Sequence, residues 1–144
     1  MHDIPVSRRH AVKFVASAIA TILPLRAARG LNAEARRVPF HPTPRKGITA
    51  AKVLTAADLT KYPGLVALFD GIREYPQIVD GIGCHCGCAL LVETHYSLLS
   101  CYESENAMAK ICPICQGEGR VAVRMARAGK SLDEIRDAID AQFG

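Results

Sequence analysis

Residues 83–88 read Gly-Cys-His-Cys-Gly-Cys, which places three thiols on alternate positions among glycines. A regular helix would put Cys84 and Cys88 on one face and point Cys86 away, because successive residues turn by about 100°. Convergence of the three sulfur atoms therefore requires a loop. The flanking glycines allow the backbone to wrap in that way. We expect a cysteine-rich loop here.

All six cysteines of the chain fall between residues 84 and 115: Cys84, Cys86, Cys88, Cys101, Cys112 and Cys115. The last two form the C-x-x-C string Cys112-Pro113-Ile114-Cys115, whose proline suits the first turn of a helix. At a helix start the macrodipole lowers thiol pKa values and favours thiolate, the form that binds metal. Because all six cysteines cluster, we expect the functional site to lie within residues 84–115.

The six cysteines are candidate ligands of a soft metal ion. Thiolates select Cu(I), zinc or iron–sulfur clusters, whereas magnesium and calcium take oxygen ligands. Two C-x-x-C pairs would be the specific zinc signature, but here one partner is C-x-C-x-C. More than four close thiols suit Cu(I) or a small polynuclear cluster better, so copper is the expected cofactor. Zinc is the alternative, because any four of these groups can make a closed tetrahedral site.

Two histidines lie near the cysteines. His95 precedes Cys101 by six residues, so it can supply an imidazole ligand or orient a loop, and we include it among the candidate metal ligands. His85 lies inside the triple-cysteine string but can point outward. Met108 and Met125 are thioether candidates, although methionines at helical spacing are more often core residues.

Two other interpretations of the cysteines stay open. An exported chain with six cysteines can carry three structural disulfides, although neighbouring C-x-C thiols bridge each other only with strain. A thiol-disulfide oxidoreductase would use Cys112 and Cys115, but the alternating strands and helices of a thioredoxin-like fold are not indicated. The sequence predicts no other catalytic residues, and the expected protein is a metal binder rather than an enzyme.

Residues 1–35 are typical of an export signal. Ser-Arg-Arg-His-Ala-Val-Lys at residues 7–13 precedes an apolar stretch, residues 14–25, that is too short to span a hydrocarbon core of about 30 Å. The paired Arg8 and Arg9 resemble a twin-arginine signal. We expect export to the periplasm or the outer face of the membrane, with membrane attachment only through an uncleaved leader.

The rest of the chain divides into a linker and one mainly α domain. Residues 36–50 contain Pro39, Pro42 and Pro44, which predict an extended tether before a helical domain at residues 51–144. Sustained period-two alternation with hairpin turns is lacking. Three helices are predicted from apolar spacing and end signals: one between Pro63 and Pro76 (Leu65, Leu68, Phe69, Ile72), one ending at Gly129 (Val121, Met125, Ala128), and one opened by a Ser131–Glu134 capping box (Leu132, Ile135, Ile139, Phe143).

The charge distribution argues against nucleic-acid binding. The chain has a formal net charge of +4, but five of its 18 Lys and Arg residues lie in the first 35 positions. From Arg36 onward 13 basic residues face 12 acidic ones, so no basic surface is expected to follow a phosphate backbone. No glycine-rich phosphate loop follows a strand-like run. The expected partners are a metal ion and a metal-delivery or redox protein.

Residues 75–144 resemble the PCYCGC-motif family of exported bacterial proteins, named for Pro-Cys-Tyr-Cys-Gly-Cys. Gly83 replaces the proline of the motif and His85 its tyrosine, which leaves the triple-cysteine spacing intact. The similarity implies an envelope protein with metal binding and no catalytic reaction. It rests on Cys84-His85-Cys86-Gly87-Cys88, on His95 with Ser97-Leu98-Leu99 and Cys101, on Cys112 and Cys115, and on Gly129 to Arg136.

A partial resemblance links the C-terminal part to the thiol-reducing subunit of cytochrome c maturation. That family also has Cys-Pro-x-Cys-Gln, here residues 112–116, followed by a helix and a Gly-Lys-Ser-x-x-Glu-Ile-Arg segment, here residues 129–136. The intervening stretch is shorter in this chain, and the other four cysteines have no counterpart there. The likeness supports only the oxidoreductase alternative.

Overall fold

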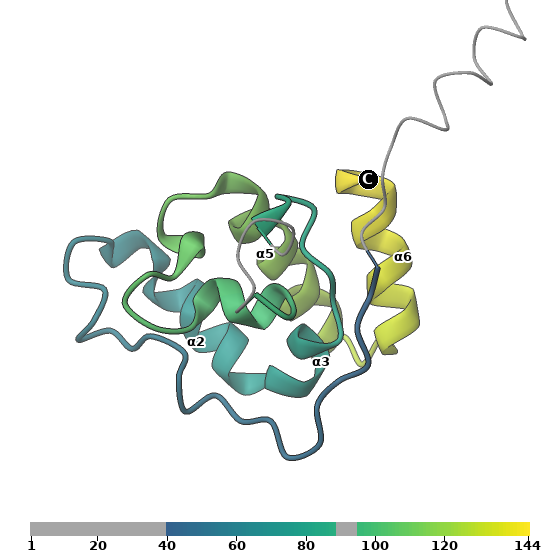
Figure 1. Cartoon of the computed structure of the whole chain (residues 1–144), viewed down its shortest axis with the longest axis horizontal. Coiled ribbons are helices and arrows are strands. Elements are labelled where there is room, and N and C mark those ends of the chain that lie inside the picture. Colours follow the sequence, from purple (N-terminus) through teal and green to yellow (C-terminus); the bar gives the residue numbers. More distant parts are fainter. Residues whose placement is uncertain (1–39, 89–94) are drawn as a thin grey trace, which may run out of the picture. The chain divides into compact units, whose positions relative to one another are not determined.

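The described part of the chain is helical, as the sequence predicted. The computed structural model describes residues 40–88 and 95–144, so the predicted export signal, residues 1–35, lies outside it. Within these two ranges the only β pairing is an isolated antiparallel bridge between Val53 and Glu103 (Figure 1). None of the helices in this part is long and apolar enough to cross a membrane.

Short helices follow one another along the chain. Proline occupies the first turn of η1, α3 and α5, where its missing N–H leaves no helical hydrogen bond unmade. The elements are the 3-10 helix η1 (Pro63–Leu65), α2 (Val66–Glu74), α3 (Pro76–Asp80), the 3-10 helices η2 (Leu98–Tyr102) and η3 (Met108–Lys110), α5 (Pro113–Arg127) and α6 (Leu132–Phe143).

The three predicted helices correspond to α2, α5 and α6. Helix α2 ends at Glu74, before the proline that was expected to stop it. The backbone reverses at Gly129 after α5, with a φ of 72°. The capping box of α6 is present, because Ser131 Oγ accepts a hydrogen bond from the Glu134 N–H while the Glu134 carboxylate accepts one from the Ser131 N–H.

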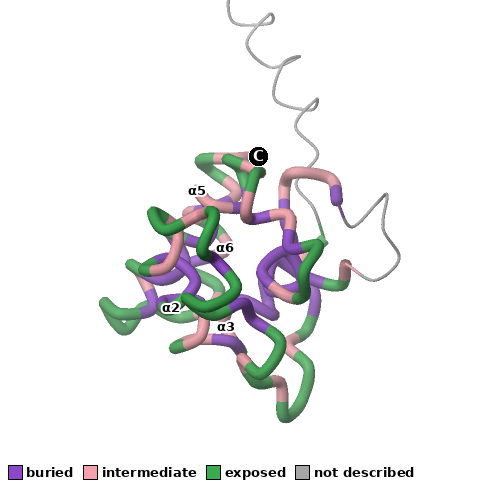
Figure 2. The backbone as a smooth tube through the Cα atoms, turned by 90° about the vertical axis from the view of Figure 1, so that its left-hand side faces the viewer, coloured by how far each residue is buried: buried purple, intermediate pink, exposed green. Residues whose placement is uncertain are grey.

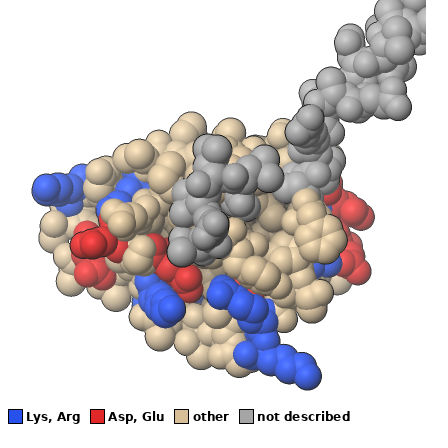
Figure 3. All heavy atoms as spheres, viewed as in Figure 1, with Lys and Arg blue, Asp and Glu red and all other residues tan. Residues whose placement is uncertain are grey.

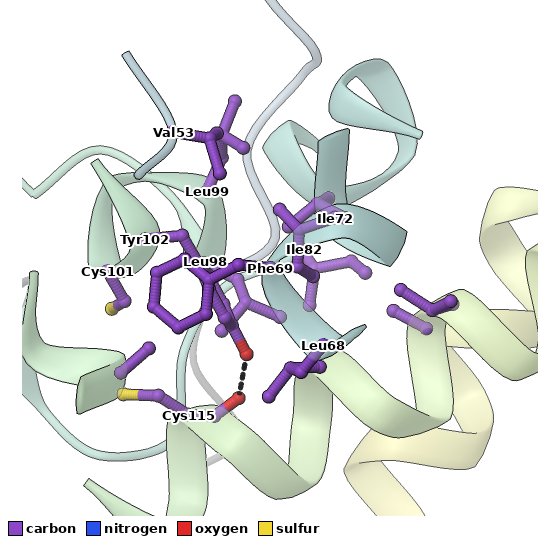
Figure 4. Packing of buried hydrophobic residues seen from close by; sticks show 14 of the residues in the cluster. Val53, Leu68, Phe69, Ile72, Ile82, Leu98, Leu99, Cys101, Tyr102 and Cys115 are labelled. Carbon is purple, nitrogen blue, oxygen red and sulfur yellow. Dashed lines mark hydrogen bonds between the residues drawn. The ribbon is translucent and has the colours of Figure 1, made fainter. Parts of the chain in front are cut away.

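The core lies where α2, η2 and α5 pack together. Phe69 of α2 meets Tyr102 of η2 edge to face, with ring centroids 4.9 Å apart, and both side chains are fully buried. The Tyr102 hydroxyl donates a 2.6 Å hydrogen bond to the carbonyl oxygen of Cys115 on α5 (Figure 4). Figure 4 shows the sulfur atoms of Cys101 and Cys115 on the same side of this aromatic pair.

Helix α6 packs on α5 through one narrow face. Its buried residues are Ile135 and Ile139, four positions apart, and exposed residues cover its outer turns (Figure 2). On the face of the molecule shown in Figure 3, basic and acidic side chains are interspersed.

The described part of the predicted linker, residues 40–50, packs against the helices. The Pro42 carbonyl oxygen accepts a 2.9 Å hydrogen bond from Arg136 on α6. Arg45 donates to the buried Asp80 of α3 through its backbone N–H and its guanidinium, and Ser97 Oγ donates to the same carboxylate at 2.8 Å. The packed unit therefore begins before residue 51, because side chains among the prolines bind partners on the helices.

Replacement of Gly119 tests the core. An alanine Cβ at this position would lie 2.0 Å from the Tyr102 hydroxyl oxygen, so Gly119→Ala must displace a buried ring and break its hydrogen bond to Cys115. We expect a loss of at least about 2 kcal/mol in the free energy of unfolding, measured by urea denaturation of the metal-free protein. Gly64→Ala is the matched control, because its Cβ meets no atom within 4 Å. Equal stability of the two variants would contradict this packing.

Replacement of Asp80 tests the attachment of the N-terminal segment. Burial opposes ionisation of Asp80, but hydrogen bonds from Arg45 and Ser97 outweigh it and hold its pKa below 3.8. This contribution to stability is present above the unfolded pKa and is lost as the pH falls through the lower folded pKa. Asp80→Asn should lower the free energy of unfolding by about 3 kcal/mol at pH 7. The difference from the unmodified protein should shrink below pH 3.8 in denaturation curves, and a constant difference down to pH 2 would contradict the account.

Candidate metal centre

Cysteines from three separate segments of the chain lie close together. Cys84 and Cys86 lie on the loop after α3, Cys101 lies in η2, and Cys115 lies in the first turn of α5. The loop turns at Gly87, whose φ of 77° would strain any residue with a side chain. The Tyr102–Cys115 hydrogen bond joins η2 to α5, so the core sets the distance between the second and third segments.

The sulfur atoms of Cys84, Cys86, Cys101 and Cys115 all lie within 4.8 Å of one another. The Cys115 sulfur is 3.6 Å from both Cys84 and Cys86, and the latter two sulfurs are 3.1 Å apart. A tetrahedral ion with metal–sulfur bonds of about 2.3 Å would hold its ligand sulfurs about 3.8 Å apart. The four thiols are therefore close enough to hold a metal ion after small adjustments.

The other predicted ligands lie outside this four-sulfur group. Cys88 is buried, with its sulfur 2.9 Å from that of Cys86. Cys112 is partly exposed and caps α5, because its sulfur accepts a 3.5 Å hydrogen bond from the Cys115 N–H. His95 is partly buried, and neither ring nitrogen has a hydrogen-bond partner among the described residues. All six cysteines are free thiols in the structure.

The pKa values of the clustered thiols are shifted in different directions. Hydrogen bonds with Cys101, then with Cys115 and Cys84, lower the pKa of the Cys86 thiol. Hydrogen bonds with Cys101 first, and also with Cys86, together with burial, raise the pKa values of Cys84 and Cys115. Burial first, then the contact with Cys86, raises the pKa of Cys88 to about 12. Because a soft cation can replace these protons, the group is suited to exchange several protons for metal.

His85 is turned away from the four-sulfur group and is buried against Glu118. Its backbone N–H lies 2.8 Å from Glu118 Oε1, and its Nδ1 lies 2.6 Å from the same atom. Its Nε2 is 3.1 Å from Asp140 Oδ1 but makes no hydrogen bond within the described residues. Burial raises the pKa of Glu118, against hydrogen bonds from Cys84 and His85 that lower it.

Sequence reasoning did not single out Glu118. Its side chain is fully buried in the middle of α5, where a carboxylate is costly unless it is paired. The one available signal was the composition around it, since glycines at positions 117 and 119 flank a lone acid, and aromatic side chains pack against both glycines. The partner was unpredictable, because His85 lies 33 residues away in the sequence.

The fold and the site define a small helical protein with four cysteines that can hold a metal ion. Comparisons of the chain with protein-family models, curated proteins and solved structures find no match. The assignment of a function therefore rests on the residues of the site itself.

The burial of the thiols predicts the order in which they react. In the folded, metal-free protein, N-ethylmaleimide should modify the partly exposed Cys86 and Cys112 first, and the buried Cys84, Cys101 and Cys115 only as fast as the structure opens. Mass spectrometry of peptides after timed quenching measures each rate. Cys112 and Cys115 provide an internal control on one peptide. Equal rates for these two in the folded state, or fewer than six reactive thiols in denaturant, would contradict the site.

Proposed function

We propose that this protein binds Cu(I) through its clustered thiolates and handles or stores the metal in the cell envelope. The observation that carries the proposal is the convergence of four sulfur atoms within 4.8 Å, with the sulfur of Cys88 only 2.9 Å from that of Cys86. Free, mostly buried thiols of this density have no evident use in a helical core, whereas soft metal ions select them.

Copper is favoured over zinc because of the position of Cys86. Its sulfur lies 3.1 Å from that of Cys84 and 2.9 Å from that of Cys88, so one thiolate can bridge two metal ions. A bridged arrangement suits a small Cu(I) cluster. Zinc is the alternative metal, because the four-sulfur group alone meets the needs of a single tetrahedral ion.

His95 is proposed as a further ligand because of its unpaired ring. Both of its ring nitrogens are buried without a hydrogen-bond partner in the part of the chain that the structure describes. Buried polar atoms normally have a partner, and a bound metal ion would supply one. We propose the imidazole as a ligand in addition to the six cysteines.

Export is proposed from the leader and from the resemblance to the PCYCGC-motif family. Arg8 and Arg9 with the following apolar stretch are typical of a twin-arginine signal. A protein exported folded by that route would acquire its metal in the reducing cytoplasm, which would protect its thiols from oxidation outside. A protein that delivers or accepts the metal would be its partner.

A thiol-disulfide oxidoreductase is the second candidate function. The observation that favours it is the partly exposed Cys112 at the start of α5, whose sulfur is held by the Cys115 N–H at 3.5 Å. A helix start of this kind stabilises a nucleophilic thiolate. In that case Cys115 would be the resolving thiol, and the other thiols would not need to bind metal.

Metal content separates these functions. Protein purified without oxygen from cells given copper and zinc should contain more than one copper ion per chain, with all thiols reduced after metal removal. Cys86→Ser should lower the copper capacity more than Cys112→Ser, because Cys86 contacts three other sulfurs while Cys112 lies outside the four-sulfur group. Elemental analysis with a free-thiol count measures both quantities.

Any other outcome of the metal analysis points to a different function. One zinc ion and no retained copper would replace the copper proposal with a structural zinc site. A metal-free protein that exchanges a Cys112–Cys115 disulfide with a partner would support the oxidoreductase. A metal-free protein whose cysteines are all oxidised would contradict both functions.

A further inference from the structure

The cysteine loop is anchored by a partly buried chain of four polar side chains, Glu118, His85, Asp140 and His41, which we call the brace. Glu118 of α5 lies 2.6 Å from His85 Nδ1 and 2.8 Å from the His85 backbone nitrogen. Because Glu118 Oε1 also accepts the backbone N–H, the contact to the ring is best satisfied by a proton on Nδ1. One carboxylate oxygen thus fixes both the backbone and the ring of the residue between Cys84 and Cys86.

The second half of the brace holds the residue before Cys84. His41 Nδ1 accepts a 3.0 Å hydrogen bond from the Gly83 N–H, so the ring proton of His41 lies on Nε2. His41 Nε2 lies 3.0 and 3.1 Å from the two oxygens of Asp140 on α6. Asp140 also lies 3.1 Å from His85 Nε2, so the two histidines have one carboxylate as a common neighbour. The amides on both sides of Cys84 are therefore bound by side chains from outside the loop.

Stability alone does not explain these groups. The side chains of Glu118 and His85 are 0% and 3% exposed, and apolar residues of similar volume would fill that space at less electrostatic cost. The arrangement instead fixes a geometry. A glycine-containing loop that must order itself when metal binds loses conformational entropy, and contacts that order the loop in advance increase metal affinity.

We propose that the brace holds residues 83–88 in the conformation that turns Cys84 and Cys86 toward Cys101 and Cys115. Glu118 and His85 act as positioning residues, and they do so without binding the metal themselves. This inference rests on the proposed metal-binding function. Loss of outer contacts of this kind commonly weakens metal affinity by about 10- to 100-fold.

Two substitutions of His85 distinguish the contact of its Nδ1 with Glu118 from the position of its Nε2 near Asp140. In His85→Asn the amide nitrogen takes the place of Nδ1 and keeps the contact with Glu118, whereas in His85→Gln it takes the place of Nε2 near Asp140. We expect His85→Asn to bind Cu(I) within about 3-fold of the unmodified protein. His85→Gln and Glu118→Ala should bind about 10- to 100-fold more weakly. The measurement is an oxygen-free competition for Cu(I) with bathocuproine disulfonate.

A control on α6 separates positioning from general stability. Glu134→Ala removes the capping box, which lowers stability without touching the loop. Its Cu(I) affinity should be unchanged, although its unfolding curve in urea shifts. If affinity instead falls in proportion to stability across all four variants, the brace is merely structural. If His85→Gln and Glu118→Ala bind as tightly as the unmodified protein, the proposal is wrong.

Amide hydrogen exchange in the metal-free protein gives a readout that does not depend on copper. Glu118→Ala should speed exchange of the His85 amide by at least about 10-fold, whereas Glu134→Ala should not. If the unmodified protein binds no Cu(I), the proposed metal-binding function is wrong. Exchange at His85 would still decide whether the brace orders the loop, since unchanged exchange in Glu118→Ala would overturn that role.

Discussion

The hydrogen bond from the Tyr102 hydroxyl to the carbonyl oxygen of Cys115 is the contact on which the described structure depends most. It is 2.6 Å long, fully buried, and joins η2 to the first turn of α5. Gly119 leaves the space for the ring, and Phe69 packs against its edge. Because Cys101 precedes Tyr102 in the chain, the same contact that closes the core also brings two of the four grouped thiols together.

The remaining two thiols come from a loop that has no regular hydrogen-bonding pattern of its own. Its conformation depends on groups supplied by other elements, chiefly Glu118 on α5 and His41 in the N-terminal segment. This dependence explains why residues 40–50 pack against the helices instead of forming a free tether. It also places the buried side chain of Glu118 beside the Cys84 thiol.

Sequence patterns predicted the helices well, because Leu68, Phe69 and Ile72 repeat at helical spacing and Ser131 with Glu134 signals a start. They did not predict α3 or the 3-10 helices, which are too short to show a period. The clustering of cysteines predicted the region of the site. The selection of Cys84, Cys86, Cys101 and Cys115 required tertiary packing, and so did the pairing of His85 with Glu118.

X-ray absorption spectroscopy at the copper edge of the Cu(I)-loaded protein tests the central claim most directly, because it reports the atoms bound to the metal. The account predicts a first shell dominated by sulfur and a second scattering path between copper ions that share the Cys86 thiolate. A first shell of nitrogen and oxygen alone would contradict metal binding by the clustered thiols. A sulfur shell without copper–copper scattering would contradict the bridged cluster.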